Sequence, residues 1–124
     1  MDHMVKKLID AAMQLPMLSQ SQADYRRFPM PALWIAHVTV TDEEAYGKYA
    51  KLAGPAIAKA GGEFIARGGR FVQLEGKERP RNVVATFPSV EAAVECYHSP
   101  EYQEALSHAR GASERELMVV ETSA

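Results

Sequence analysis

One segment of the sequence has residue types suited to binding an anion, because Arg67 is followed directly by Gly68 and Gly69. A guanidinium group offers a fork of hydrogen-bond donors, and glycine lets a carboxylate or a phosphate approach the backbone closely. The structural alternative is a strand bulge in which Arg67 pairs with a carboxylate such as Glu75. The fingerprints GxGxxG and GxxxxGKS/T are absent, so neither nucleotide-binding pattern applies.

His37 is the residue best suited to proton transfer, because histidine changes charge near neutral pH. It lies in the apolar segment 33–40, LWIAHVTV, where a lone histidine is also a common hydrogen-bonded core residue. Glu75 indicates a turn out of a strand, and it would serve as a general base only if it were buried. Arg81 fits either the mouth of a pocket or an exposed position.

Aromatic and basic residues also gather near the C-terminus, where Tyr97, Tyr102 and Arg110 surround an interrupted helix. The tyrosines fit core aromatics with polar tips, and Arg110 fits a group that binds helix-end carbonyls. All three are also candidates to line a binding pocket. His98 precedes a Ser-Pro pair and is expected to be exposed, with haem ligation as the alternative. Cys96, the single cysteine, is expected to be a core residue.

Composition narrows the class of protein. The 124 residues suit one domain, with 47% hydrophobic and 24% charged residues, which are ordinary globular values. A net charge of -2 without a basic run argues against a dedicated nucleic-acid binder, and no apolar stretch is long enough to span a membrane. The four histidines show no metal-ligand spacing, so neither a metal nor a cofactor is expected.

The first helix and strand follow from the residue pattern after position 32. Segment 33–40 predicts a strand with two largely apolar faces. Thr41 and Glu44 predict a capping box for the helix that follows. Gly54-Pro55 is expected to kink or split this helix, and Gly61-Gly62 to end it. Its expected buried residues are Tyr46, Tyr49, Ala53, Ala56, Ile57 and Ala60.

The remaining elements complete a known order. Segment 63–76 predicts a strand broken at Gly68-Gly69, and 82–87 predicts a third strand. Two short helices follow, capped by Ser89 and Ser99, and 115–121 predicts the last strand. The order βαββαβ predicts an α+β, ferredoxin-like fold, with a four-stranded antiparallel sheet and helices on one face.

The sheet face away from the helices needs a cover. Alternation places Trp34, Ala36, Val38 and Val40 on one face of the first strand, and Leu33, Ile35, His37 and Thr39 on the other. An open apolar sheet face usually marks association. We therefore expect a homodimer that closes two such sheets into a barrel, with His37 in the interior.

Residues 1–29 differ in character from the rest and are interpreted as an N-terminal extension before a barrel domain at 30–124. Segment 5–13 predicts an amphipathic helix, and a polar linker follows Pro16. Two interpretations are open: an appended or over-extended N-terminus with Met30 as the natural start, or a helix that packs on a partner subunit. No secretory or transit signal is recognised, which favours the cytoplasm.

Several motifs together resemble the bacterial domain of unknown function 1330 (DUF1330), a family of the dimeric α+β barrel superfamily. They are PALWIAHVTVTDEEAYGKYA, ARGG, LEG, FPSVEAA and CYHSPEYQEALSHARGAS, and the resemblance covers roughly residues 31–121. It implies a ferredoxin-like subunit, a homodimer and a pocket between sheet and helices, but no established reaction. Superfamily relatives include cofactor-free monooxygenases, haem-degrading enzymes, muconolactone isomerases and stress-induced barrel proteins, which is likeness of fold alone.

Two positions depart from the family pattern. Thr86 stands where relatives often have glutamate before FPS, and Cys96 stands where an aromatic residue is common. If that glutamate is the acid or base of the family, this chain has lost or altered the activity.

Two functional hypotheses follow. The first is a homodimeric, cofactor-independent protein that binds a small anionic or aromatic metabolite, with a monooxygenase- or isomerase-like reaction as its enzymatic form. The second is a non-catalytic dimeric structural or stress-related module with a solid core. In the first, His37 exchanges a proton, and the ligand contacts Arg67, Gly68, Gly69, Trp34, Thr86, Tyr97 and Arg110.

Overall fold

The fold is known from a computed structural model that describes residues 30–123. The predicted amphipathic helix and linker within residues 1–29 lie outside the described residues. The elements, in chain order, are β1 (Ala32–Val40), α3 (Glu43–Lys59), β2 (Glu63–Arg67), β3 (Arg81–Phe87), α4 (Val90–His98), α5 (Pro100–Ala109) and β4 (Ser113–Glu121).

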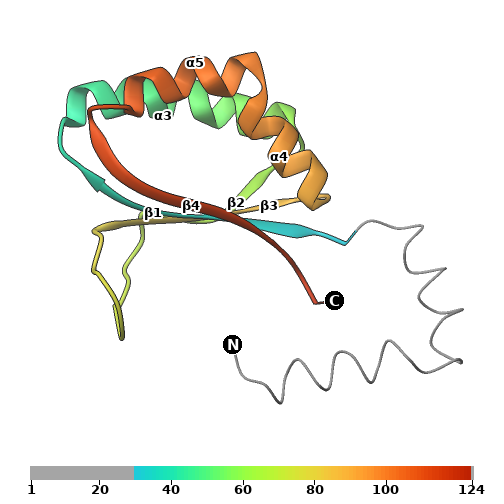
Figure 1. The fold of residues 1–124 in the computed structure, drawn as a ribbon, viewed down its shortest axis with the longest axis horizontal. Helices are drawn as coiled ribbons and strands as arrows, with labels where there is room; N and C mark the ends of the chain where they lie inside the picture. The colour runs from blue at the N-terminus through green and yellow to red at the C-terminus, as the bar shows by residue number, and fades with distance from the viewer. Residues whose placement is uncertain (1–29, 124) are drawn as a thin grey trace, which may run out of the picture.

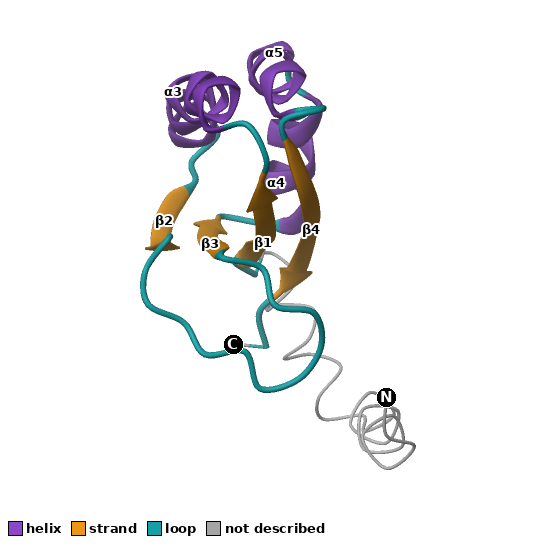
Figure 2. Cartoon of the chain, turned by 90° about the vertical axis from the view of Figure 1, so that its left-hand side faces the viewer, coloured by secondary structure: helices purple, strands orange, loops and turns teal. Residues whose placement is uncertain are grey.

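The four strands form one antiparallel sheet in the order β2-β3-β1-β4. All three helices cover the same face of this sheet, and α3 lies beside α5 (Figures 1 and 2). The ferredoxin-like α+β fold predicted from the sequence is therefore confirmed. None of the helices in the described part of the chain has both the length and the apolarity that a membrane crossing requires.

The core lies between the helices and the inner face of the sheet. Trp34 on the central strand β1 is 1% exposed, and its ring stacks on Phe87 and meets Tyr102 edge-on. Burial along β1 alternates as the sequence predicts: Ala32, Trp34, Ala36 and Val38 are buried, whereas the residues between them are partly or fully exposed. This alternation places β1's large aromatic on the helix side.

Helix α3 differs from the prediction at both its start and its middle. The N-cap is Asp42 rather than Thr41, and its carboxylate accepts a hydrogen bond from the Ala45 amide at 3.1 Å. The helix also continues through Pro55 as one element. Pro55 is exposed, while the buried residues on either side of it hold both halves on the core. The predicted end is confirmed, with Gly61 at a φ of 89°.

Two glycines of this region are expected to respond in opposite ways to a methyl group. Gly47 lies inside α3, and a Cβ there would meet nothing within 4 Å, so Gly47→Ala should stabilise the protein by about 0.5–1 kcal/mol. At Gly62 a Cβ would lie 2.5 Å from Ile57 and 2.7 Å from Phe87. Gly62→Ala should therefore cost about 1–3 kcal/mol. Urea unfolding of both variants checks the pair, and equal effects would contradict it.

Strand β2 is shorter than predicted, and its irregularity lies earlier. The strand ends at Arg67, and the shift in register lies between Phe64 and Ala66 rather than at Gly68-Gly69. Gly68, with a φ of 70°, instead turns the chain into a long loop. This loop, residues 68–80, projects beyond the sheet face opposite the helices (Figure 1).

The outer face of the sheet carries no helix. We call it the open face, and its apolar residues are Leu33, Ile35, Val84, Met118 and Val120. Met118 is 54% and Val120 is 40% exposed, and the adjacent loop exposes Val72 and Leu74 by 70% and 87%. These values match the predicted need for a cover over this face.

A polar network anchors the loop to one end of the open face. Arg79 donates to Glu116 at 2.7 Å, to Thr39 at 3.0 Å and to Glu114 at 3.2 Å. Asn82 donates to the Arg79 carbonyl oxygen and meets Nδ1 of His37 at 2.6 Å. His37 is therefore part of a hydrogen-bonded surface network.

This network should make stability depend on pH. The hydrogen bond and charge of Arg79 hold the pKa of Glu116 below its ordinary value of 4.5. A carboxyl with a lower pKa in the folded state contributes stability above its unfolded pKa, and this is lost as the pH falls through the folded pKa. We expect Arg79→Gln to lower the melting temperature at pH 7, and the difference from wild type to shrink below pH 4.5. Melting curves between about pH 3 and 7 check this; a constant difference would refute it.

Candidate functional site

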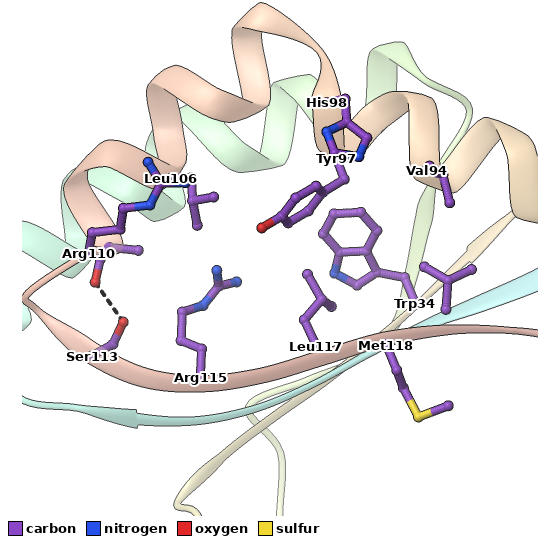
Figure 3. A pocket seen from close by; sticks show the side chains of 12 residues that line it. Trp34, Val94, Tyr97, His98, Leu106, Arg110, Ser113, Arg115, Leu117 and Met118 are labelled. Carbon is purple, nitrogen blue, oxygen red and sulfur yellow. Dashed lines mark hydrogen bonds between the residues drawn. The ribbon is translucent and has the colours of Figure 1, made fainter.

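A groove of about 510 Å³ runs between strand β4 and helices α4 and α5. Trp34, Leu117 and Arg115 point into it from the sheet, and Tyr97 enters it from α4 (Figure 3). Val94, Leu106 and Val119 add apolar wall, while Arg110 and Ser113 lie at the end where α5 turns into β4. The groove thus combines an apolar wall with one half-buried cation.

Aromatic rings fix the shape of this wall. The ring centroid of Trp34 lies 6.2 Å from that of Tyr97 and 5.1 Å from that of Tyr102. The ring centroids of Tyr97 and Tyr102 lie 5.5 Å apart. Because each ring is held by others, the wall is rigid and suited to a flat, partly apolar ligand.

Arg115 joins two buried tyrosines at the floor of the groove. Its Nη2 donates to Tyr49 Oη at 2.8 Å and to Tyr102 Oη at 3.2 Å, and the two hydroxyls lie 2.8 Å apart. The Arg115 guanidinium also lies 4.7 Å from the centre of the Tyr49 ring. Burial raises the pKa of both tyrosines, so both are neutral phenols at physiological pH.

Counting protons shows which donors remain. The two Nη2 protons of Arg115 go to the tyrosines, and one hydroxyl proton is used between Tyr49 and Tyr102. One phenol O–H, the Arg115 Nε–H and the two Nη1 protons are then left. Nε of Arg115 is buried without a partner. The cluster therefore offers hydrogen-bond donors to an acceptor that the described residues do not supply.

A small cavity of about 30 Å³ lies beneath α3, and we call it the inner cavity. Trp34 and Arg115 line both this cavity and the groove, so the two adjoin. Two further arginines, Arg67 and Arg81, line it as well. Its other walls are aromatic or aliphatic side chains: Ala36, Tyr46, Tyr49, Ala50, Ala53, Ile57, Phe64 and Val83.

Strand register explains why these arginines meet. Arg81 on β3 and Arg115 on β4 both pair with Val38, so they flank one small residue of the central strand on its helix-facing side. Arg67 pairs with Val83, one row further along. Its guanidinium stacks 4.1 Å from the centre of the Phe64 ring.

The register shift in β2 puts Arg67 on this side. In a regular strand, Phe64 and Arg67 would face opposite sides, because they are three residues apart. The shift between Phe64 and Ala66 adds one residue, so that both side chains face α3. Bulges commonly re-aim a side chain in this way.

None of the three arginines has a carboxylate partner in the part of the chain that the structure describes. The ion pairs there involve Lys59, Lys77 and Arg79 instead. Nε of Arg81, like that of Arg115, is buried without a hydrogen-bond partner. Arg81 and Arg115 are half-buried, whereas Arg67 is exposed. Half-buried cations without counter-charges favour the binding of an anion.

The structure brings together some of the residues predicted from the sequence. Trp34, Tyr97 and Arg110 line the groove, and Arg67 lines the adjoining inner cavity. Gly68 touches neither, but a Cβ on it would lie 2.9 Å from Nη1 of Arg81. Its lack of a side chain therefore makes room for an arginine rather than for a ligand.

Other predicted residues lie apart from the groove. His37 and Thr86 are on the open face, and a Cβ on Gly69 would meet nothing within 4 Å. His37 and Thr86 were expected to share a pocket with Arg67. This expectation is corrected, because both residues lie on the open face, whereas Arg67 faces α3 on the other side of the sheet. Thr86, the departure from the family pattern, donates to the Glu63 carbonyl oxygen at 3.4 Å.

The remaining candidates have structural positions. Glu75 lies in the exposed loop and forms no ion pair with Arg67. His98 is exposed, as expected, and it lines the groove. Cys96 is a core residue whose pKa burial raises to about 11. No three His, Cys, Asp or Glu side chains of the described residues form a group that could hold a metal ion.

Sequence reasoning missed Arg115 and the cation–tyrosine cluster. The signal was present, because alternation in RELMVVE places Arg115 on the same face as Leu117 and Val119. An arginine at an inward position of an otherwise apolar strand is unusual enough to mark a site. Tyr49 was predicted to be buried, but its partnership with Arg115 depends on packing between α3 and β4.

The sequence matches the family described as domain of unknown function (DUF1330) over residues 31–123. The chain belongs to this family. No curated protein matches it.

Solved structures similar to this DUF1330 chain share its fold. RPA0582, a protein of unknown function from Rhodopseudomonas palustris, is 24% identical, with a TM-score of 0.64 over 85% of this chain and 93% of that one. SnoaB, a cofactor-independent oxygenase from Streptomyces nogalater, is 12% identical, with a TM-score of 0.56 over 77% and 95%. A dimeric ferredoxin-like protein of unknown function from Bacteroides fragilis is 13% identical, with a TM-score of 0.54 over 77% and 99%.

Proposed function

We propose that this DUF1330 protein is a homodimer that binds a small, partly apolar anion in the groove beside β4. The observation that carries the proposal is the convergence of Arg67, Arg81 and Arg115 without a carboxylate partner among the described residues. Arg81 and Arg115 are half-buried, and half-buried cations without counter-charges are costly to keep in a fold. Their presence beside an aromatic groove is accounted for by a ligand that brings the missing charge.

The homodimer part rests on the open face. Its apolar residues, with the exposed loop beside them, form a surface of the kind that usually associates. Two copies would pack these faces together, with the groove of each subunit on its helix side. Similar proteins from Bacteroides fragilis and Thermobifida fusca are described as dimeric and ferredoxin-like, which supports the same assembly here. Cytoplasmic residence stays a prediction.

The enzymatic form of this proposal is a cofactor-independent reaction on the bound anion. Arg115 and the remaining phenol O–H would donate to a ligand oxygen on which negative charge develops. An oxygenation or an isomerisation through such an oxyanion fits these donors. The fold shared with the oxygenase SnoaB supports the class only by analogy. The solid-core module is disfavoured, because a groove of about 510 Å³ is present.

Thermal unfolding with a panel of aromatic and aliphatic carboxylates, phosphonates and matched neutral amides tests the proposal. We expect anions to raise the melting temperature and amides to leave it unchanged, since a ligand that binds only the folded state stabilises it. The Arg115→Met variant should lose the response. If no anion raises the melting temperature at millimolar concentration, the proposal is wrong and the association module replaces it.

A further inference from the structure

We infer that the charged group of the ligand is a carboxylate, bound head-first in the inner cavity between Arg81 and Arg115. This inference rests on the proposed function and adds the chemical class of the ligand. It also assigns a role to Arg81, for which the sequence analysis left two positions open, the mouth of a pocket and an exposed site.

The size of the inner cavity limits what can enter it. Its volume is about 30 Å³, far below the roughly 300–1,000 Å³ of typical small-molecule pockets. A planar carboxylate needs room for one oxygen atom in the cavity, while its second oxygen faces Arg115 at the groove. A tetrahedral phosphate or phosphonate carries a third oxygen and is bulkier, so we expect it to fit this small cavity less well.

The donors suit a flat, two-oxygen acceptor. Arg81 and Arg115 flank Val38 from opposite sides, and each has a buried Nε–H without a partner. Guanidinium groups bind carboxylates through paired, charge-assisted hydrogen bonds. The charge of three arginines would favour a dianion such as a phosphonate, whereas the small cavity favours a carboxylate. An experiment that compares the two ligands can therefore separate the effects of charge and volume.

Substitutions at Gly68 and Gly76 provide a matched pair of variants that tests the role of Arg81. A methyl group on Gly68 would lie 2.9 Å from Nη1 of Arg81, so Gly68→Ala should push that guanidinium out of place. Gly76 lies in the same loop at a similar backbone angle, 85° against 70°, but its nearest neighbour is the Gln73 amide at 3.6 Å. The Gly76→Ala variant therefore reproduces the backbone strain without disturbing Arg81.

The experiment titrates benzoate, phenylphosphonate and benzamide, which carry the same ring, into the full-length protein. Trp34 is the only tryptophan and lines both the groove and the inner cavity, so its fluorescence reports binding. We expect benzoate to bind at least about tenfold more tightly than phenylphosphonate, and benzamide not to bind. Calorimetry checks the affinities.

The variants then assign the residues. Arg81→Gln and Gly68→Ala should each weaken benzoate binding at least about tenfold, while Gly76→Ala and Arg70→Gln, whose residues lie in the exposed loop, should leave it unchanged. Phenylphosphonate binding as tightly as benzoate would overturn the carboxylate inference and leave the proposed function standing. Loss of binding in Gly76→Ala equal to that in Gly68→Ala would remove Arg81 from the site. If neither anion binds, the proposed function itself fails.

Discussion

Replacing Arg115 with methionine is expected to abolish most anion binding without a matching loss of stability. Removing one partner of a desolvated charge pair typically costs about 2–5 kcal/mol of binding free energy, or roughly 30-fold or more in affinity. In the free protein, however, Arg115 has no carboxylate partner among the described residues. An apolar side chain of similar length removes that desolvation cost while giving up two hydrogen bonds to tyrosine. The free energy of unfolding should therefore stay within about 1 kcal/mol of wild type or rise.

Arg110→Met is the matched control for this variant. Arg110 lines the same groove but is exposed at its end, so its loss should change affinity by much less. Benzoate titration and urea unfolding of both variants give the comparison. A large loss of stability in Arg115→Met with intact binding would show that the arginine is a structural residue.

An aspartate at position 118 is expected to convert the proposed dimer into monomers. Met118 pairs across the sheet with Ile35 on the open face and points away from the groove (Figure 3). It is 54% exposed in the subunit, so a charge there costs the isolated fold little. In a symmetric dimer the substitution enters the interface twice. At about 3 kcal/mol for each unpaired buried charge, the dissociation constant should rise about 10⁴-fold.

Leu52→Asp provides the comparison, since Leu52 is 38% exposed but lies on α3, on the other side of the sheet. This variant should remain dimeric. Sedimentation velocity over a range of protein concentrations distinguishes the two states. A dimeric Met118→Asp protein would show that the subunits associate through another surface.

The fold could be predicted because its signals are local. Alternation along 33–40, the helical stripe from Tyr46 to Ile57 and the turn at Gly61 each determine one element without reference to the others. The departures are also local. Asp42 replaced Thr41 as the cap, since either residue has a suitable side chain, and only the backbone geometry decides between them.

The site could be predicted only in part, because it depends on which face each strand residue occupies. Arg67 was identified from its own neighbourhood, but Arg81 and Arg115 join it through register with Val38, which no short segment reveals. His37 was predicted on the open face, where the structure has it, but it was grouped in one site with Trp34 and Arg67, which face the helices. It is three residues from Trp34 in a regular strand, so the two must lie on opposite faces.

The irregularity in β2 has a consequence for how this site is encoded. The irregularity absorbs one residue between Phe64 and Ala66, and this turns Arg67 toward α3. Deleting Ile65 would remove the extra residue and place Arg67 two residues after Phe64, so a regular strand would keep the guanidinium facing α3. Pairing of the full-length strand without the irregularity would instead turn Arg67 to the open face. The ligand site therefore depends on the match between strand length and the irregularity, which the presence of the arginine alone does not reveal.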